Sequence, residues 1–157
     1  MNILKSGIAV ISPRIRRIIA WLAVVIWMGV IFSLSAQTSE RSDRLSTGVT
    51  AVLARVVETV APRATIDVAA WNHGIRKGAH FMAYLLLGIL AAIAFRSSGV
   101  RGKRGMAWAL LLCLLYAAGD EGHQLLVPGR GAQVTDVLLD TAGAGAGICI
   151  IKLLKGI

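Results

Sequence analysis

Nine polar side chains between residues 77 and 140 have types and spacings that could support chemistry. They are Lys77, His80, Tyr84, Asp120, Glu121, Gln124, Arg130, Asp136 and Asp140. His80 with Asp120 or Glu121 would make an acid–base pair, and Lys77 with Arg130 would hold a phosphate. His80, Asp120 and Glu121 are therefore candidate catalytic residues, and the other six are candidate ligand-binding residues.

The same side chains also have structural interpretations, which the sequence leaves open. Lys77 could extend toward lipid headgroups, and Tyr84 could anchor a helix at the membrane interface. Asp120 and Glu121 could form ion pairs with basic residues between helices. No serine or cysteine is placed as an obvious nucleophile, so enzymatic activity stays an open question. No metal-binding or cofactor motif is present, and we expect neither group.

The composition indicates the kind of structure that must position these residues. The chain has 157 residues with 56% hydrophobic and 16% charged residues, and its formal net charge is +9. A soluble domain usually carries roughly a quarter charged residues, and a disordered chain is much less hydrophobic. The basic residues flank apolar runs and form no stripe, which argues against nucleic acid as a partner. The composition therefore predicts an integral membrane protein.

Four apolar runs have about the 20 residues that a spanning helix needs. They cover approximately residues 18–36, 79–95, 106–122 and 134–154. Between the first two, residues 47–60 show helical periodicity but are too few to span, which predicts an amphipathic helix in the outer interface. We expect an all-α fold: a polytopic membrane helix bundle, residues 1–157 forming one domain, with about four transmembrane helices and this interfacial helix.

Basic residues in the short loops predict the orientation of this bundle. They precede the first run, separate the second from the third, and follow the fourth, which places both termini in the cytoplasm. We therefore expect a multi-pass protein of the cell inner (cytoplasmic) membrane, with the nine polar residues at its outer leaflet. A cleaved signal peptide is the alternative for the first run, and it leaves this orientation unchanged.

The small-residue run from Gly143 to Gly147 predicts a close helix–helix contact, because glycines at i, i+4 let two helices approach each other. It contains no nucleotide-binding motif. A homo-oligomer formed through this face is a further expectation.

The order and spacing of the polar residues resemble the VanZ-like family of small bacterial integral membrane proteins. The resemblance lies in WNHGIRKGAHFMAYLLLG and AAGDEGHQLLVPGRGAQVTDVLLDTAGAGAG, and in FSLSAQ after the first apolar run. The positions that match are Lys77, His80, Phe81, Tyr84, Asp120, Glu121, Gln124, Pro128, Arg130, Asp136, Asp140 and Gly143. The family is named for a protein linked to teicoplanin resistance, so the resemblance implies a cell-envelope role but no defined activity.

Two functions follow as hypotheses. In the first, the outer polar residues bind an envelope lipid or lipid-linked precursor, with an implied link to glycopeptide (teicoplanin) resistance. In the second, the protein is non-enzymatic and structural, and its charges form an interhelical ion-pair network. A transporter is less favoured, because no inverted repeat is evident.

Overall fold

The computed structural model describes residues 12–37, 47–48, 59, 68–127 and 131–155. These residues form an all-α bundle whose elements are α1 (Pro13–Ser35), α3 (Val68–Ser97), α4 (Gly102–Gln124) and α5 (Val134–Lys155). The predicted all-α fold with four long helices is confirmed. The predicted interfacial helix at 47–60 falls almost wholly outside the described residues, as does Arg130.

Three of the helices are long and apolar enough to cross a membrane: Pro13–Ser35, Trp71–Ser97 and Val134–Leu154. The fourth predicted span, in α4, is not among them. This helix has 23 residues, as α1 does, so its length is sufficient. Its apolar run is short, because Lys103 and Arg104 precede it and Asp120 and Glu121 follow it. The chain is a membrane protein in which α4 carries charge at both ends.

The second apolar helix begins earlier than its hydropathy indicated. The predicted span begins at about residue 79, but α3 starts at Val68. Arg76 and Lys77, expected in the connection before this span, therefore lie on the helix. Polar residues can continue a helix beyond its apolar run because the backbone hydrogen bonds are the same. A hydropathy window therefore underestimates the length of the helix.

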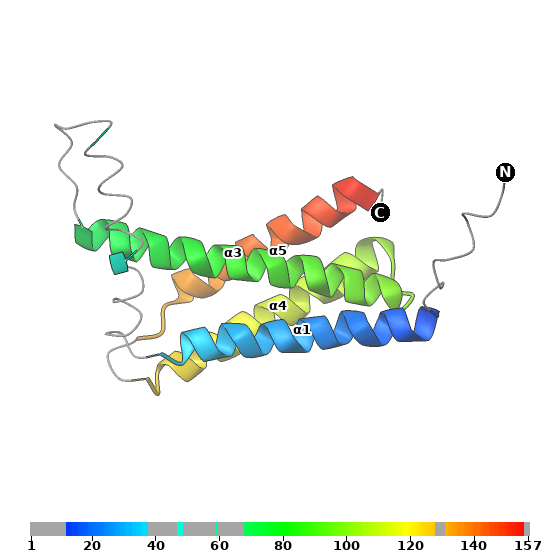
Figure 1. Cartoon of the computed structure of the whole chain (residues 1–157), viewed down its shortest axis with the longest axis horizontal. Helices are drawn as coiled ribbons and strands as arrows, with labels where there is room; N and C mark the ends of the chain where they lie inside the picture. Colours follow the sequence, from blue (N-terminus) through cyan, green and yellow to red (C-terminus); the bar gives the residue numbers. More distant parts are fainter. Residues whose placement is uncertain (1–11, 38–46, 49–58, 60–67, 128–130, 156–157) are drawn as a thin grey trace.

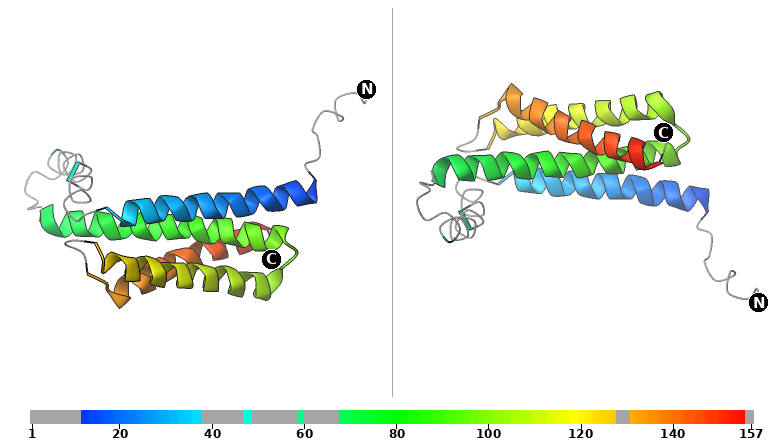
Figure 2. Two further views of the ribbon diagram at one scale, coloured as in Figure 1. Left: turned by 90° about the horizontal axis from the view of Figure 1, so that it is seen from below. Right: turned by 90° about the horizontal axis from the view of Figure 1, so that it is seen from above.

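The helices alternate in direction along the chain, as Figures 1 and 2 show. α1 and α4 run one way, and α3 and α5 run the other. The end of α1, the start of α3, the end of α4 and the start of α5 therefore lie at one end of the bundle. α3 packs against α5, α1 and α4. It is thus the central helix, and the side chains on its first turns can meet residues from the other helices.

Small side chains fill much of the core. Fully buried alanines come from α3, α4 and α5, and are joined by Val24 and Ile31 of α1. Large apolar side chains point outward instead, among them Leu22, Val25 and Ile26. An outward apolar surface of this kind suits acyl chains and not water, as expected for helices in a bilayer.

Three glycines let α3 and α5 approach backbone to backbone; we call them the glycine seam (Gly88, Gly143 and Gly147). A Cβ atom on Gly143 would overlap the Phe81 carbonyl oxygen, and one on Gly147 would overlap that of Leu85. A Cβ atom on Gly88 would meet the backbone of Ala144 in the same way. The predicted packing role of the 143–147 run is confirmed. Because α3 of the same chain covers this face, an oligomer would need another surface.

Side-chain hydrogen bonds tie α1 to the other helices. The Trp27 indole donates to the Ala83 carbonyl oxygen of α3 (2.9 Å), and the Tyr116 hydroxyl of α4 donates to that of Met28 (2.5 Å). Where the core is apolar, such bonds fix the rotation of a helix about its own axis. α1 therefore presents Ser35 to the interior at the end where α4 finishes.

Candidate functional site

Every acidic residue in the described part of the chain lies at one end of the bundle. They are Asp120, Glu121, Asp136 and Asp140, and we call this end the acidic end. The opposite end carries basic residues at the start of α1, around the α3–α4 connection and near the end of α5. At the acidic end, Arg76 and Lys77 of α3 are the basic residues closest to these carboxylates in the described structure. The two ends thus differ in charge, and the acidic end contains both signs.

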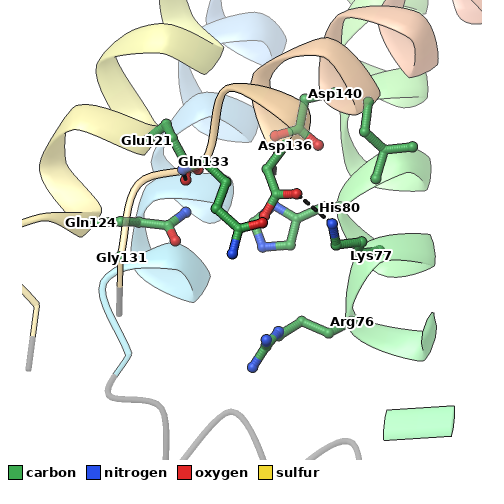
Figure 3. A pocket seen from close by; sticks show the side chains of 10 residues that line it. Arg76, Lys77, His80, Glu121, Gln124, Gly131, Gln133, Asp136 and Asp140 are labelled. Carbon is green, nitrogen blue, oxygen red and sulfur yellow. Dashed lines mark hydrogen bonds and ion pairs between the residues drawn. The ribbon is translucent and has the colours of Figure 1, made fainter. Parts of the chain in front are cut away.

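A polar cavity of about 170 Å³ opens at the acidic end (Figure 3). Its walls come from α3, α4, α5 and the segment that precedes α5. The lining residues are Arg76, Lys77, His80, Glu121, Gln124, Gly131, Gln133, Asp136, Leu139 and Asp140. A volume of this size holds several water molecules or a small polar group.

One ion pair and one longer histidine–aspartate contact lie between α3 and α5 on the cavity wall. Lys77 Nζ lies 2.7 Å from Asp136 Oδ1, and His80 Nδ1 lies 3.8 Å from Asp140 Oδ2. Because the helices run in the same direction, one turn along α3 matches one turn along α5. The glycine seam continues the same register toward the bundle centre, through Phe81 and Gly143. The close backbone contact therefore determines which charges face each other.

Two further contacts fix α4 at the cavity. Glu121 Oε1 accepts a hydrogen bond from the backbone N–H of Gln133, just before α5 begins (2.5 Å). Gln124 Nε2 donates to the Ser35 hydroxyl at the end of α1 (2.9 Å). Ser35, Glu121 and Gln124 are all buried. Burying a polar group costs little free energy when the group has a hydrogen-bond partner. These two contacts therefore connect α4 to α1 and to the segment before α5 without any ligand.

Two oxygens of side chains that do not line the cavity have no hydrogen-bond partner among the described residues. They are the Tyr84 hydroxyl and Asp120 Oδ1, and both side chains are buried. Asp140 Oδ1, on the cavity wall, is in the same condition. A buried oxygen without a partner usually means that a water molecule or a ligand belongs there.

Exposure decreases inward along the wall between α3 and α5. The side chains of Lys77 and Asp136 are each 31% exposed, whereas that of Asp140 is 6% exposed. We call the region of Arg76, Lys77 and Asp136 the rim, and the buried lining side chains of Asp140, Glu121 and Gln124 the inner wall. Electrostatic interactions strengthen as water is excluded, so a charge on a ligand would matter most at the inner wall.

The structure brings six of the nine sequence-predicted residues to one cavity: Lys77, His80, Glu121, Gln124, Asp136 and Asp140. Tyr84 and Asp120 are buried and do not line it, and Arg130 is outside the described residues. His80 Nδ1 contacts Asp140 Oδ2, whereas the sequence offered Asp120 or Glu121 as the acidic partner of His80. Lys77, proposed to hold a phosphate, contacts Asp136. The catalytic and binding roles stay predictions.

Sequence reasoning missed three residues at this site. Arg76 and Gln133 line the cavity, and Ser35 accepts from Gln124. Arg76 was expected in a loop. Its position directly before Lys77, a predicted site residue, could have identified it as a candidate. Ser35 lies in FSLSAQ, a stretch noted for its resemblance but not for its position. Within the described residues, no three His, Cys, Asp or Glu side chains converge closely enough to hold a metal ion.

An apolar helical bundle with a polar, mixed-charge cavity at one end defines the class of integral membrane proteins. Comparison with family models identifies it further: the VanZ/LLP1 model matches residues 20–155, which is nearly the whole chain. The chain belongs to the VanZ/LLP1 family. No curated protein and no solved structure gives a significant match.

Proposed function

We propose that the cavity at the acidic end receives the polar headgroup of an envelope lipid or a lipid-linked precursor. The observation that carries this proposal is Asp140, which lines the cavity, is buried, and leaves Oδ1 without a partner in the described structure. A buried carboxylate at membrane depth is costly unless something pairs with it. A bound headgroup would supply the missing donor.

The location of the cavity supports a lipid in preference to a wholly soluble ligand. Outward-facing apolar side chains cover the length of the bundle, and the cavity lies where the helices end (Figure 1). Acyl chains would lie along the apolar surface while the headgroup turns into the polar cavity. If the protein binds envelope lipids in this way, it changes the surface that a lipophilic glycopeptide meets, which is the resistance role implied by the family name.

The charge difference between the two ends supports an orientation in the cell inner membrane with both termini cytoplasmic and the cavity outside. The basic residues at the end opposite the cavity match the bias that keeps cytoplasmic loops inside. A green fluorescent protein fused after residue 157 should fluoresce, and alkaline phosphatase fused there should be inactive. The reverse pattern would place the cavity on the cytoplasmic side.

Native mass spectrometry of the protein released from detergent tests the lipid proposal. We expect wild type to retain a defined phospholipid or polyprenyl phosphate, and Glu121→Gln and His80→Ala to retain much less. Lys103→Gln is the matched control, because Lys103 is exposed at the opposite end and its loss should not change retention. Equal retention in wild type and both cavity variants would refute the proposal.

The second candidate function is structural, and the Lys77–Asp136 pair favours it. At 2.7 Å these charges neutralise each other across α3 and α5 without any ligand. Together with the contacts of Glu121 and Gln124, they would hold the bundle ends in place. In this case no lipid adduct appears in wild type, and the cavity variants differ from it only in thermal stability.

A further inference from the structure

The charges of the cavity are arranged by depth. At the rim, Lys77 is paired with Asp136, and Arg76 adds a second cation to the lining. The buried part of the lining contains Asp140, one helical turn after Asp136 on α5, and Glu121 of α4. The inner wall is therefore acidic and the rim is of mixed sign, which is a pattern that selects the orientation of a charged ligand.

Asp140 is the group at the inner wall that lacks a short counter-ion contact. Its Oδ2 lies 3.8 Å from His80 Nδ1, which exceeds the length of a direct hydrogen bond. Its Oδ1 has no partner among the described residues, although the side chain is only 6% exposed. An oxygen in this state needs a donor, and a charged donor satisfies it best.

The other inner-wall groups offer acceptors as well. Glu121 carries a second carboxylate oxygen in addition to the one that binds Gln133. Gln124 uses its amide nitrogen on Ser35, which leaves its side-chain oxygen as an acceptor. A phosphate at this depth would stand against two buried carboxylates, and like charges at short range in a water-poor site repel strongly.

We propose that the inner wall, formed by Asp140, Glu121 and Gln124, binds a primary ammonium group. The ammonium belongs to a phosphoethanolamine-type headgroup whose phosphate lies at the rim near Arg76 and Lys77. A primary ammonium has three N–H donors, which equals the number of acceptor groups on the inner wall. The rim and inner wall are one helical turn apart, about 5 Å, a separation that suits a two-carbon linker.

This inference rests on the proposed headgroup function and specifies its chemistry, because the ammonium and not the phosphate is the group recognised at depth. The same ammonium could be presented by a lipid or by a free amine. The test therefore uses both kinds of probe on the full-length protein in detergent.

The probes are phosphatidylethanolamine, phosphatidylcholine, phosphatidylglycerol and water-soluble phosphoethanolamine, each scored by native mass spectrometry. We expect wild type to bind phosphatidylethanolamine about tenfold more tightly than phosphatidylglycerol, which lacks the charged donor. Phosphatidylcholine should also bind about tenfold more weakly, because its methyl groups replace all three donors. The comparison needs only wild type, so it does not depend on the folding of any variant.

Asp140→Asn locates the selectivity. This change keeps the shape of the side chain and removes its charge, and it should abolish the preference for phosphatidylethanolamine. Gly145→Ala is the matched control on the same helix, since the added methyl has only the Leu110 side chain near it, at 3.9 Å. A preference that persists in Asp140→Asn would overturn the assignment to the inner wall.

The probes also separate this inference from the function on which it rests. Tighter binding of phosphatidylglycerol would leave lipid binding intact and refute the ammonium site. Binding of phosphoethanolamine without any lipid would support the ammonium site and refute the lipid proposal. Binding of none of the four probes would refute the ammonium site, and retention of another native lipid would then decide the broader proposal by itself.

Discussion

Replacing Gly147 with alanine is expected to lower the free energy of unfolding by about 1–3 kcal/mol, the usual cost of overpacking. The new Cβ atom would overlap the Leu85 carbonyl oxygen and would lie 3.0 Å from the carbonyl carbon and 3.1 Å from the backbone nitrogen of Ile89. Backbone atoms cannot rotate away as a side chain can, so α3 and α5 would have to separate. Thermal unfolding in detergent, followed by circular dichroism, measures the loss.

Gly145→Ala is the internal control for this substitution. Gly145 lies on α5 between two seam glycines, but its nearest neighbour is a side-chain atom at ordinary contact distance. Alanine favours a helix by about 1 kcal/mol over glycine, so this variant should be neutral or slightly more stable. Equal melting temperatures for Gly145→Ala and Gly147→Ala would show that the α3–α5 contact is looser than the structure indicates.

The glycine seam also connects stability with the cavity. Phe81 lies next to His80 on α3, and its carbonyl oxygen is the atom that a side chain at position 143 would overlap. Separating the helices at this level would therefore move His80 away from Asp140. The seam glycines determine the register, and the register determines which charges meet.

The sequence was sufficient to predict which residues lie at each end of the bundle, because hydropathy and loop charge depend only on neighbouring residues. Apolar runs and basic loops depend on nearby residues, so the four helices and the gathering of Lys77, Glu121 and Asp136 at one end followed from hydropathy and chain direction. The start of α3 did not follow, because Asn72, His73 and the basic pair are polar and a hydropathy window excludes them, although they continue the helix.

The pairings inside the site could not be predicted, because they depend on helix register. Hydropathy places His80 at the same level as Asp120, Glu121 and Asp140 without ranking these acids as partners. The direct backbone contact of α3 with α5 places Asp140 Oδ2 3.8 Å from His80 Nδ1. Ser35 was missed for a related reason: a serine in an apolar run is recognisable as polar, but the rotation of α1 decides whether it faces lipid or Gln124.

Glu121 provides the sharpest distinction between the structural and the binding interpretations. Glu121→Ala is expected to lower the free energy of unfolding by about 1–3 kcal/mol, because it leaves the Gln133 N–H without its acceptor. Glu121→Gln should retain most of the stability, since the amide oxygen can accept the same hydrogen bond. The measurement is thermal unfolding of both variants beside wild type, in detergent without added lipid.

The two substitutions separate geometry from charge when ligand retention is measured on the same samples. A stable Glu121→Gln variant that no longer retains lipid would assign the negative charge of Glu121 to ligand binding, because the α4–α5 contact is intact. If Glu121→Gln is as unstable as Glu121→Ala, the negative charge of Glu121 contributes to the stability of the helix bundle. In that case the negative charge stabilises the N-terminus of α5, whose first backbone N–H groups carry a partial positive charge.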